Sequence, residues 1–129
     1  MHTELMLLAW SALLCLALAL PYATGLTLTR GLPVMVGNRE GFAEPTGWMG
    51  RAKRAHMNMV ENLVPFAALV LIAVVAQKTN STTLLGAQLF FWARVVHAVA
   101  YIAGIPYVRT AAYAVGLVGM VMIFLAIVG

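Results

Sequence analysis

Polar side chains crowd the mouth of an apolar segment in RAKRAHMNMVENLVPF, residues 51–66, which continues directly into AALVLIAVVA. On a helix that advances about 100° per residue, five of these side chains fall within an arc of about 100°. They are Arg51, Arg54, Asn58, Glu61 and Asn62. Arginine forks bind carboxylates in a bidentate manner, and amides add further hydrogen bonds. This face therefore predicts recognition of a small anion.

Two later segments carry similar polar faces. Arg94, His97 and Tyr101 follow the spacing i, i+3, i+7, which places them on one side of a helix. Arg109 and Thr110 begin the next segment, and Tyr113 stands one turn beyond Arg109. We expect the three faces to meet in one half of the membrane and to form a single site.

The charges of these faces do not balance. Four arginines (Arg51, Arg54, Arg94 and Arg109) face a single carboxylate, that of Glu61. A self-contained structural network tends to neutrality because unpaired buried charges are costly, so the surplus favours an anionic ligand with more than one carboxylate. Two alternatives stay open. Glu61 could pair with Arg94 or Arg54 simply to fix helix packing, and Arg51 and Arg54 could snorkel to the membrane surface.

The remaining candidate side chains offer no metal site and no nucleophile. We expect His56, which lies away from the polar face, to be a hydrogen-bonded packing residue and not a haem ligand. Asn62 and the GLVG of residues 116–119 are expected to serve helix packing. Cys15 is the sole cysteine and lies on a different helix, so it can form no internal disulfide. A nucleophile must then come from the bound ligand.

The composition is that of a membrane protein. The 129 residues, enough for one domain, are 63% hydrophobic and 9% charged, with a mean hydropathy of +0.93. Soluble domains are about 45–50% apolar and about 25% charged. The net charge of +4 comes from basic residues scattered through apolar sequence, which argues against nucleic acid as a partner and is better explained by membrane topology and ligand binding. The partners that we expect are therefore a small ligand and membrane lipid.

Four apolar runs are long enough to cross a bilayer, which takes about 20 helical residues. They cover about residues 5–28, 50–76, 82–103 and 107–128. None alternates with the period of two that barrel strands need, so the sequence predicts an all-α, integral membrane four-helix bundle. The first run is longer than a signal-peptide core and follows no Lys or Arg, and we expect it to be a span.

Loop charge predicts the orientation. Arg30, Arg39, Arg51, Lys53 and Arg54 lie around the first connection, and Arg109 follows the third. The opposite side carries only Lys78. By the positive-inside rule, the first and third connections lie in the cytoplasm and both termini lie outside. The site would then open toward the cytoplasmic side.

The motif RAKRAHMNMVENLVPF resembles the signature of the MAPEG family, the membrane-associated proteins of eicosanoid and glutathione metabolism. The resemblance continues in RVVHAVAY, residues 94–101, and in the Arg-Thr-x-x-Tyr of residues 109–113. Three motifs on three predicted helices make it specific, and it extends over essentially the whole chain. The chain departs from the family pattern at Met57, where some eukaryotic members have arginine, and at Arg30, which is displaced from a first-helix arginine.

The resemblance implies a homotrimer of four-helix subunits that binds glutathione in clefts between adjacent subunits. It implies glutathione-binding roles for several residues of the polar faces, to which the spacing argument adds Arg51. These are Arg54, Asn58, Glu61, Arg94, His97 and Tyr113. It also implies that Tyr101 is a glutathione-binding position and that Arg109 stabilises the glutathione thiolate. We expect Tyr101 or Thr110 to donate a hydrogen bond to the sulfur.

The function that follows is a glutathione-dependent transferase or peroxidase acting on lipophilic electrophiles, in a bacterial-type member expected in the inner membrane. Glutathione would be the cosubstrate, and its thiolate the nucleophile. Two alternatives remain. One is a non-catalytic binding or structural trimer of the same fold. The other is a small transporter, which the excess of arginine over carboxylate disfavours.

Overall fold

The structure, a computed structural model, describes residues 2–31 and 46–129. It contains four helices: α1 (Thr3–Arg30), α3 (Gly47–Val75), α4 (Ser81–Ala103) and α5 (Pro106–Val128). The described residues contain no strand, and all four helices are long and apolar enough to cross a membrane. The all-α prediction is confirmed, and the helix ends lie within three residues of the predicted ones.

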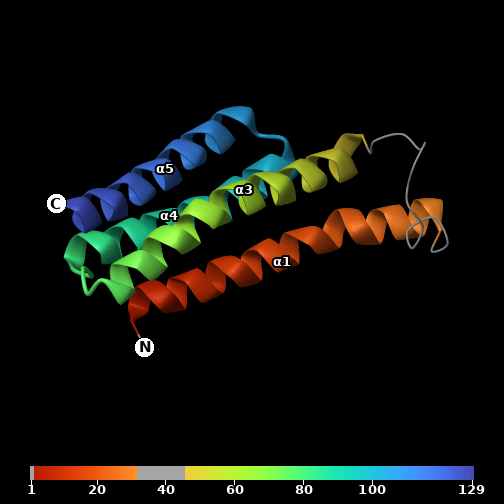
Figure 1. Ribbon diagram of the computed structural model, residues 1–129. Coiled ribbons are helices and arrows are strands. Elements are labelled where there is room, and N and C mark those ends of the chain that lie inside the picture. The colour runs from red at the N-terminus through yellow and green to blue at the C-terminus, as the bar shows by residue number, and fades with distance from the viewer. Residues whose placement is uncertain (1, 32–45) are drawn as a thin grey trace.

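The helices run side by side along one axis, with both termini at the same end as the turn between α3 and α4 (Figure 1). The turn between α4 and α5 lies toward the other end, near the start of α3. Within the described residues, α4 packs most extensively against α5, and α1 packs mainly on α3. Helices α1 and α5 do not contact each other, so α3 and α4 form the centre of the bundle.

The ends of α4 are fixed by local hydrogen bonds. At its start, the Asn80 side chain accepts from Thr83 N at 3.0 Å, and the Thr83 hydroxyl accepts from Asn80 N at 2.8 Å, which is a capping box. At its end, Gly104 adopts φ 81°, and Ile105 N donates to Ala100 O at 2.8 Å. Pro106 then starts α5. This short turn brings the first residues of α5 beside the last turn of α4.

A buried carboxylate joins the starts of α1 and α4. Glu4 is 6% exposed and accepts a hydrogen bond from the Thr83 hydroxyl at 2.7 Å. Thr83 lies eleven residues before Arg94 on the same helix, which corresponds to about 16 Å along the axis. Glu4 therefore does not neutralise the arginines of the predicted site.

The core is built around an aromatic pair. Phe66 of α3 stacks on Phe90 of α4, with ring centroids 3.9 Å apart and an angle of 13° between the planes. Both rings are completely buried, together with Met59, and Val70 and Ile123 are almost so. Stacked aromatic rings contribute more than their buried area alone, so this pair fixes α3 against α4 below the polar site.

Glycines allow α4 and α5 to pack closely. A Cβ atom on Gly86 would lie 2.5 Å from the backbone oxygen of Gly119, and one on Gly119 would lie even closer to the backbone oxygen of Gly86. Real Cβ atoms essentially never lie so close to backbone, so both positions require glycine. The expectation that the GLVG segment mediates helix contacts is confirmed. The close contact holds α5 where Arg109 and Tyr113 can face α4.

Replacing Gly119 with alanine should therefore destabilise the protein by about 1–3 kcal/mol, because the backbone of α4 must move to make room. Gly116→Ala is the matched control on the same helix. Its Cβ atom would meet Ala93, Phe90 and Arg94 at 3.7–3.9 Å, which is ordinary contact. Thermal unfolding in detergent should show a loss for Gly119→Ala only, and equal effects would contradict this account of the contact.

Candidate functional site

A polar hollow of about 330 Å³ opens between three helices. It is lined by Asn58 of α3, His97 and Tyr101 of α4, and Arg109, Thr110 and Tyr113 of α5. All six are residues that the sequence nominated, although they come from segments up to 55 residues apart. The structure thus brings the three predicted polar faces together.

Arg54 and Glu61, two of the predicted α3 residues, do not line the hollow. The buried residues Ala55, Met59 and Phe66 lie just beside the polar arc of this helix. The side chains of Asn58 and Asn62 are consequently half-buried at the near edge of the arc. At the far edge, Arg54 and Glu61 are exposed.

The ion pairs considered as an alternative from the sequence are not formed. Within the described residues, Glu61 makes no ion pair with Arg54 or with Arg94, and Arg94 Nε has no partner. A structural network within one chain therefore does not explain these charges.

Arg51 has a partner of its own. Its Nε donates to the backbone oxygen of Ile102 at 3.0 Å, and a Cβ atom on Gly104 would lie 3.5 Å from the same nitrogen. The Ile102 oxygen belongs to the last turn of α4, where carbonyl groups lack helical partners. Arg51 does not line the hollow. It instead joins the start of α3 to the end of α4, next to the turn between Tyr101 and Arg109.

Two buried polar side chains on α4 lack hydrogen-bond partners. Arg94 and His97 are each 2% exposed, and neither Arg94 Nε nor His97 Nδ1 has a partner among the described residues. More than about nine in ten buried polar groups are hydrogen-bonded in native proteins. His97 lines the hollow, and Arg94 lies one turn before it on the same face of α4. Arg94 Nε can only donate a hydrogen bond, whereas His97 Nδ1 donates or accepts according to its tautomer, so both are candidates for contact with a polar ligand group.

The guanidinium of Arg109 is held by an aromatic ring. Its Cζ atom lies 4.6 Å from the centre of the Tyr101 ring, within the range of a cation–π interaction. The Tyr101 ring in turn lies 5.4 Å from the His97 ring. Tyr113, 40% exposed, stands one turn along α5 at the rim. The stacking leaves the donor edge of the guanidinium available to an anion in the hollow.

The Thr110 hydroxyl already has an acceptor. It donates to Pro106 O at 3.0 Å, so its single proton is used within the helix. Of the two candidate donors to a ligand sulfur, Tyr101 forms no such internal hydrogen bond with the residues that the structure describes. We therefore expect Thr110→Val, which keeps the shape and removes the hydroxyl, to change ligand affinity less than about twofold. A loss of tenfold or more in a calorimetric titration would give Thr110 a direct role.

His56 and Cys15 belong to helix packing. The Nδ1–H of His56 donates to the backbone oxygen of Cys15 at 3.1 Å, because that oxygen can only accept. This bond joins α3 to α1, as expected for a packing histidine. In the described part of the chain, no group of three His, Cys, Asp or Glu side chains could hold a metal.

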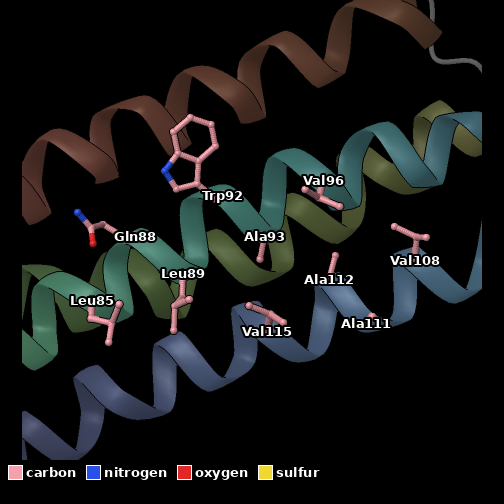
Figure 2. Close-up of a pocket in the computed structure, with 10 residues that line it drawn as sticks. All are labelled: Leu85, Gln88, Leu89, Trp92, Ala93, Val96, Val108, Ala111, Ala112 and Val115. Atoms are coloured by element: carbon pink, nitrogen blue, oxygen red, sulfur yellow. The ribbon is translucent and has the colours of Figure 1, made fainter.

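An apolar groove of about 530 Å³ runs along the opposite flank of α5, between α4 and α5. Its walls are apolar except for Gln88. Figure 2 shows Leu89 pointing from α4 toward α5 and Val115 pointing back, while Gln88 and Trp92 project from the side of α4 away from α5. Because α5 stands between the groove and the hollow, the groove can hold an apolar molecule but does not expose it to Arg109.

The profile of the MAPEG family matches residues 6–129, almost the full length of the chain. The chain belongs to the MAPEG family. The family resemblance found in the three polar motifs is confirmed. No solved structure matches this MAPEG member.

Curated relatives of this MAPEG chain include microsomal glutathione S-transferase 1 from several mammals. The Homo sapiens protein is 38% identical over 56 residues, which are 43% of this chain and 36% of that protein. The Mus musculus protein is 34% identical over 69 residues, or 54% of this chain and 44% of that protein. The matches thus cover less than half of the length of these relatives.

Asn62 lies on the polar face of α3 and was expected from the sequence to serve helix packing. Asn62 lies behind Asn58 and donates to it from one turn away. Its i, i+4 spacing from Asn58 was the available signal, because residues four apart on a helix are neighbours.

Proposed function

We propose that this chain is a glutathione-dependent transferase or peroxidase that acts on lipophilic electrophiles. The observation that carries the proposal is the hollow with its surplus of unpaired donors. Arg109 and His97 line it, and the buried Arg94 stands one turn away with a free Nε. The chain's membership of the MAPEG family and its similarity to microsomal glutathione S-transferase 1 support glutathione as the cosubstrate.

Glutathione fits the residues present. It has two carboxylates, one amine and a thiol, so it offers acceptors for the arginines and one cation for a carboxylate such as Glu61. The hollow of about 330 Å³ falls in the usual range for small-molecule sites, about 300–1,000 Å³. Asn58, Arg94 and His97 would hold acceptor groups of the peptide, and Arg109 would face the sulfur.

The chemistry supplied by glutathione is that of a thiol nucleophile. A free thiol has a pKa of about 8.5, and a nearby cation lowers this value so that thiolate forms at neutral pH. In this proposal the Arg109 guanidinium, held on the Tyr101 ring, is that cation. The Tyr101 hydroxyl would donate a hydrogen bond to the sulfur. The chain would add orientation of the thiolate toward an incoming electrophile.

A lipophilic substrate suits the surroundings of the site. The four helices are of membrane-spanning length, and many of their large apolar side chains are exposed, among them Val64, Trp92 and Leu125. Molecules dissolved in a bilayer would therefore reach this protein along its apolar surface. Polar electrophiles would not be concentrated at that surface.

A turnover assay tests the proposal against a non-catalytic trimer of the same fold. Purified protein in detergent is incubated with glutathione and either chlorodinitrobenzene or an organic hydroperoxide. Product formation that depends on both substrates and is lost in Arg109→Leu supports an enzyme. Glutathione binding without turnover of either class would favour the non-catalytic alternative.

We further propose that the protein is a homotrimer whose subunits meet near α3. Arg54 and Glu61 support this, because both are exposed on α3 although Glu61 lies deep in an apolar segment. A charged side chain facing lipid costs about 2.5–3.5 kcal/mol or more at the centre of a bilayer. A neighbouring subunit, or glutathione bound between subunits, would remove that cost.

If glutathione extends from the hollow to the interface between subunits, Arg54→Ala and Glu61→Gln should each weaken its binding about tenfold or more, because each removes a charged contact. The measurements are calorimetric titration and light scattering of the detergent complex. The mass should stay that of the wild type, with Lys53→Ala as the control. Unchanged affinity in both variants would remove these residues from the site.

The proposed location is a bacterial inner membrane, with the site toward the cytoplasm and both termini outside. The basic residues of the first connection support this orientation; of these, Arg39 lies outside the described residues. Figure 1 shows both termini at the end away from the α4–α5 turn. An alkaline phosphatase reporter after Gly129 should be active, and a reporter active only in the cytoplasm would reverse the orientation.

A further inference from the structure

Two amides are hydrogen-bonded to each other one turn apart on α3, at the wall of the hollow. Asn62 Nδ2 lies 2.9 Å from the backbone oxygen of Asn58 and 3.2 Å from the side-chain Oδ1 of Asn58. Both residues are half-buried. Asn58 lines the hollow and Asn62 does not, so Asn62 stands behind a predicted ligand contact.

These contacts fix which end of each amide faces the other. A backbone oxygen can only accept a hydrogen bond, so the atom of Asn62 that faces it must be the NH₂ group. The same NH₂ group faces the Asn58 side chain, whose facing atom must then be its oxygen. The group of Asn58 that remains free is its own NH₂, which carries two donors and no acceptor.

We infer that Asn62 is a positioning residue that holds the Asn58 amide with its NH₂ group free for the hollow, so that Asn58 binds an acceptor group of the ligand. The inference rests on the proposed glutathione site. It adds that Asn58 is the donor in its hydrogen bond to the ligand. Without Asn62, the Asn58 amide could turn and present its oxygen. An oxygen there would repel a carboxylate or a peptide carbonyl.

The arginines on α4 and α5 have the same donor-only character, Arg109 at the hollow and Arg94 one turn from it. Arg109 and the buried Arg94 can only donate, and neither has an ion-pair partner among the described residues. With Asn58 fixed as a donor, all three helices present hydrogen-bond donors. The site would therefore select a ligand rich in acceptor groups.

The test is a double-mutant cycle in calorimetric titrations with reduced glutathione. Asn62→Leu removes the donor without adding charge, and it should weaken binding about 3- to 10-fold. Asn62→Asp should turn the Asn58 amide round and weaken binding about 10- to 100-fold. In an Asn58→Leu background, Asn62→Leu should have less than about a twofold effect, because the amide it positions is gone.

The Asp variant also adds a negative charge, and the same background measures that contribution. The loss caused by Asn62→Asp in Asn58→Leu is the through-space effect of the charge, and only the remainder acts through Asn58. Equal losses from Asn62→Leu with and without the Asn58 side chain would overturn the inference. So would an Asn62→Leu variant that binds as tightly as the wild type.

A measurement without ligand separates this inference from the proposed function. The chain has four asparagines, so their side-chain NH₂ signals can be assigned by single substitutions in isotope-labelled protein. The Asn62 NH₂ protons should exchange with solvent more slowly than those of Asn58, and Asn62→Leu should shift the Asn58 signals. Asn58 protons that exchange as slowly as those of Asn62 would refute the inference. Failure of the wild type to bind glutathione would refute only the proposed function.

Discussion

Replacing Arg94 with methionine should make the ligand-free protein more stable and at the same time abolish most of its glutathione binding. Arg94 is 2% exposed, and its Nε has no partner in the described part of the chain. Exchanging buried charge for a well-packed apolar side chain often stabilises a protein by about 1–4 kcal/mol. A lost charge-assisted hydrogen bond should weaken binding about 10- to 100-fold.

Thermal unfolding without glutathione and calorimetric titration with it give the two values. Arg54→Met is the control, because it removes the same charge from an exposed position and should bring no comparable gain in stability. A ligand-free Arg94→Met protein that unfolds at a lower temperature than the wild type would show that the guanidinium supports the fold. A higher unfolding temperature together with weaker glutathione binding would show that the Arg94 guanidinium serves the ligand.

Replacing Arg109 with leucine should raise the thiol pKa of bound glutathione and lower conjugation of a lipophilic electrophile at neutral pH. Each pKa unit corresponds to about 1.4 kcal/mol of lost preference for the thiolate. Below the thiol pKa, each unit also lowers the thiolate fraction about tenfold. The pH–rate profile should therefore move to higher pH, and the rate should recover in alkaline buffer. Binding should suffer less, since Asn58, His97 and Arg94 remain.

Arg109→Lys is the matched variant for charge. Lysine keeps a cation but lacks the planar fork that lies over the Tyr101 ring, so it should restore the pH profile only in part. An alternative is that Arg109, in the first turn of α5, only stabilises the helix at the membrane surface. That alternative predicts lower thermal stability with an unchanged pH–rate profile, and such a profile would remove Arg109 from thiolate activation.

The helices and the meeting of their polar faces were accessible from the sequence for simple physical reasons. Each helix is an apolar run of bilayer length, and a bilayer admits few other structures. The i, i+3, i+7 spacing of Arg94, His97 and Tyr101 predicted one face, and two of the three line the hollow. The short gap between the predicted runs 82–103 and 107–128 indicated a tight connection, which places Arg109 beside Tyr101.

Spacing alone could not predict which polar residues of α3 line the hollow and which are exposed. Periodicity shows that Arg54, Asn58 and Glu61 share a side, but the packing of Met59 and Phe66 decides which edge of that side is buried. The role of Arg51 depends on a backbone oxygen of Ile102, 51 positions away, which leaves no trace in side-chain types. The proposed contacts between subunits, likewise, leave no pattern of spacing within one chain.

Binding of glutathione to the purified wild-type protein tests the central claim most directly. The ultraviolet absorbance of the thiolate is followed against pH in protein with bound glutathione and compared with Arg109→Leu and with free glutathione. The account predicts saturable binding, with a bound-thiol pKa below that of free glutathione that returns toward the free value in Arg109→Leu. Absence of binding, or a bound thiol that titrates like free glutathione in the wild type, would contradict it.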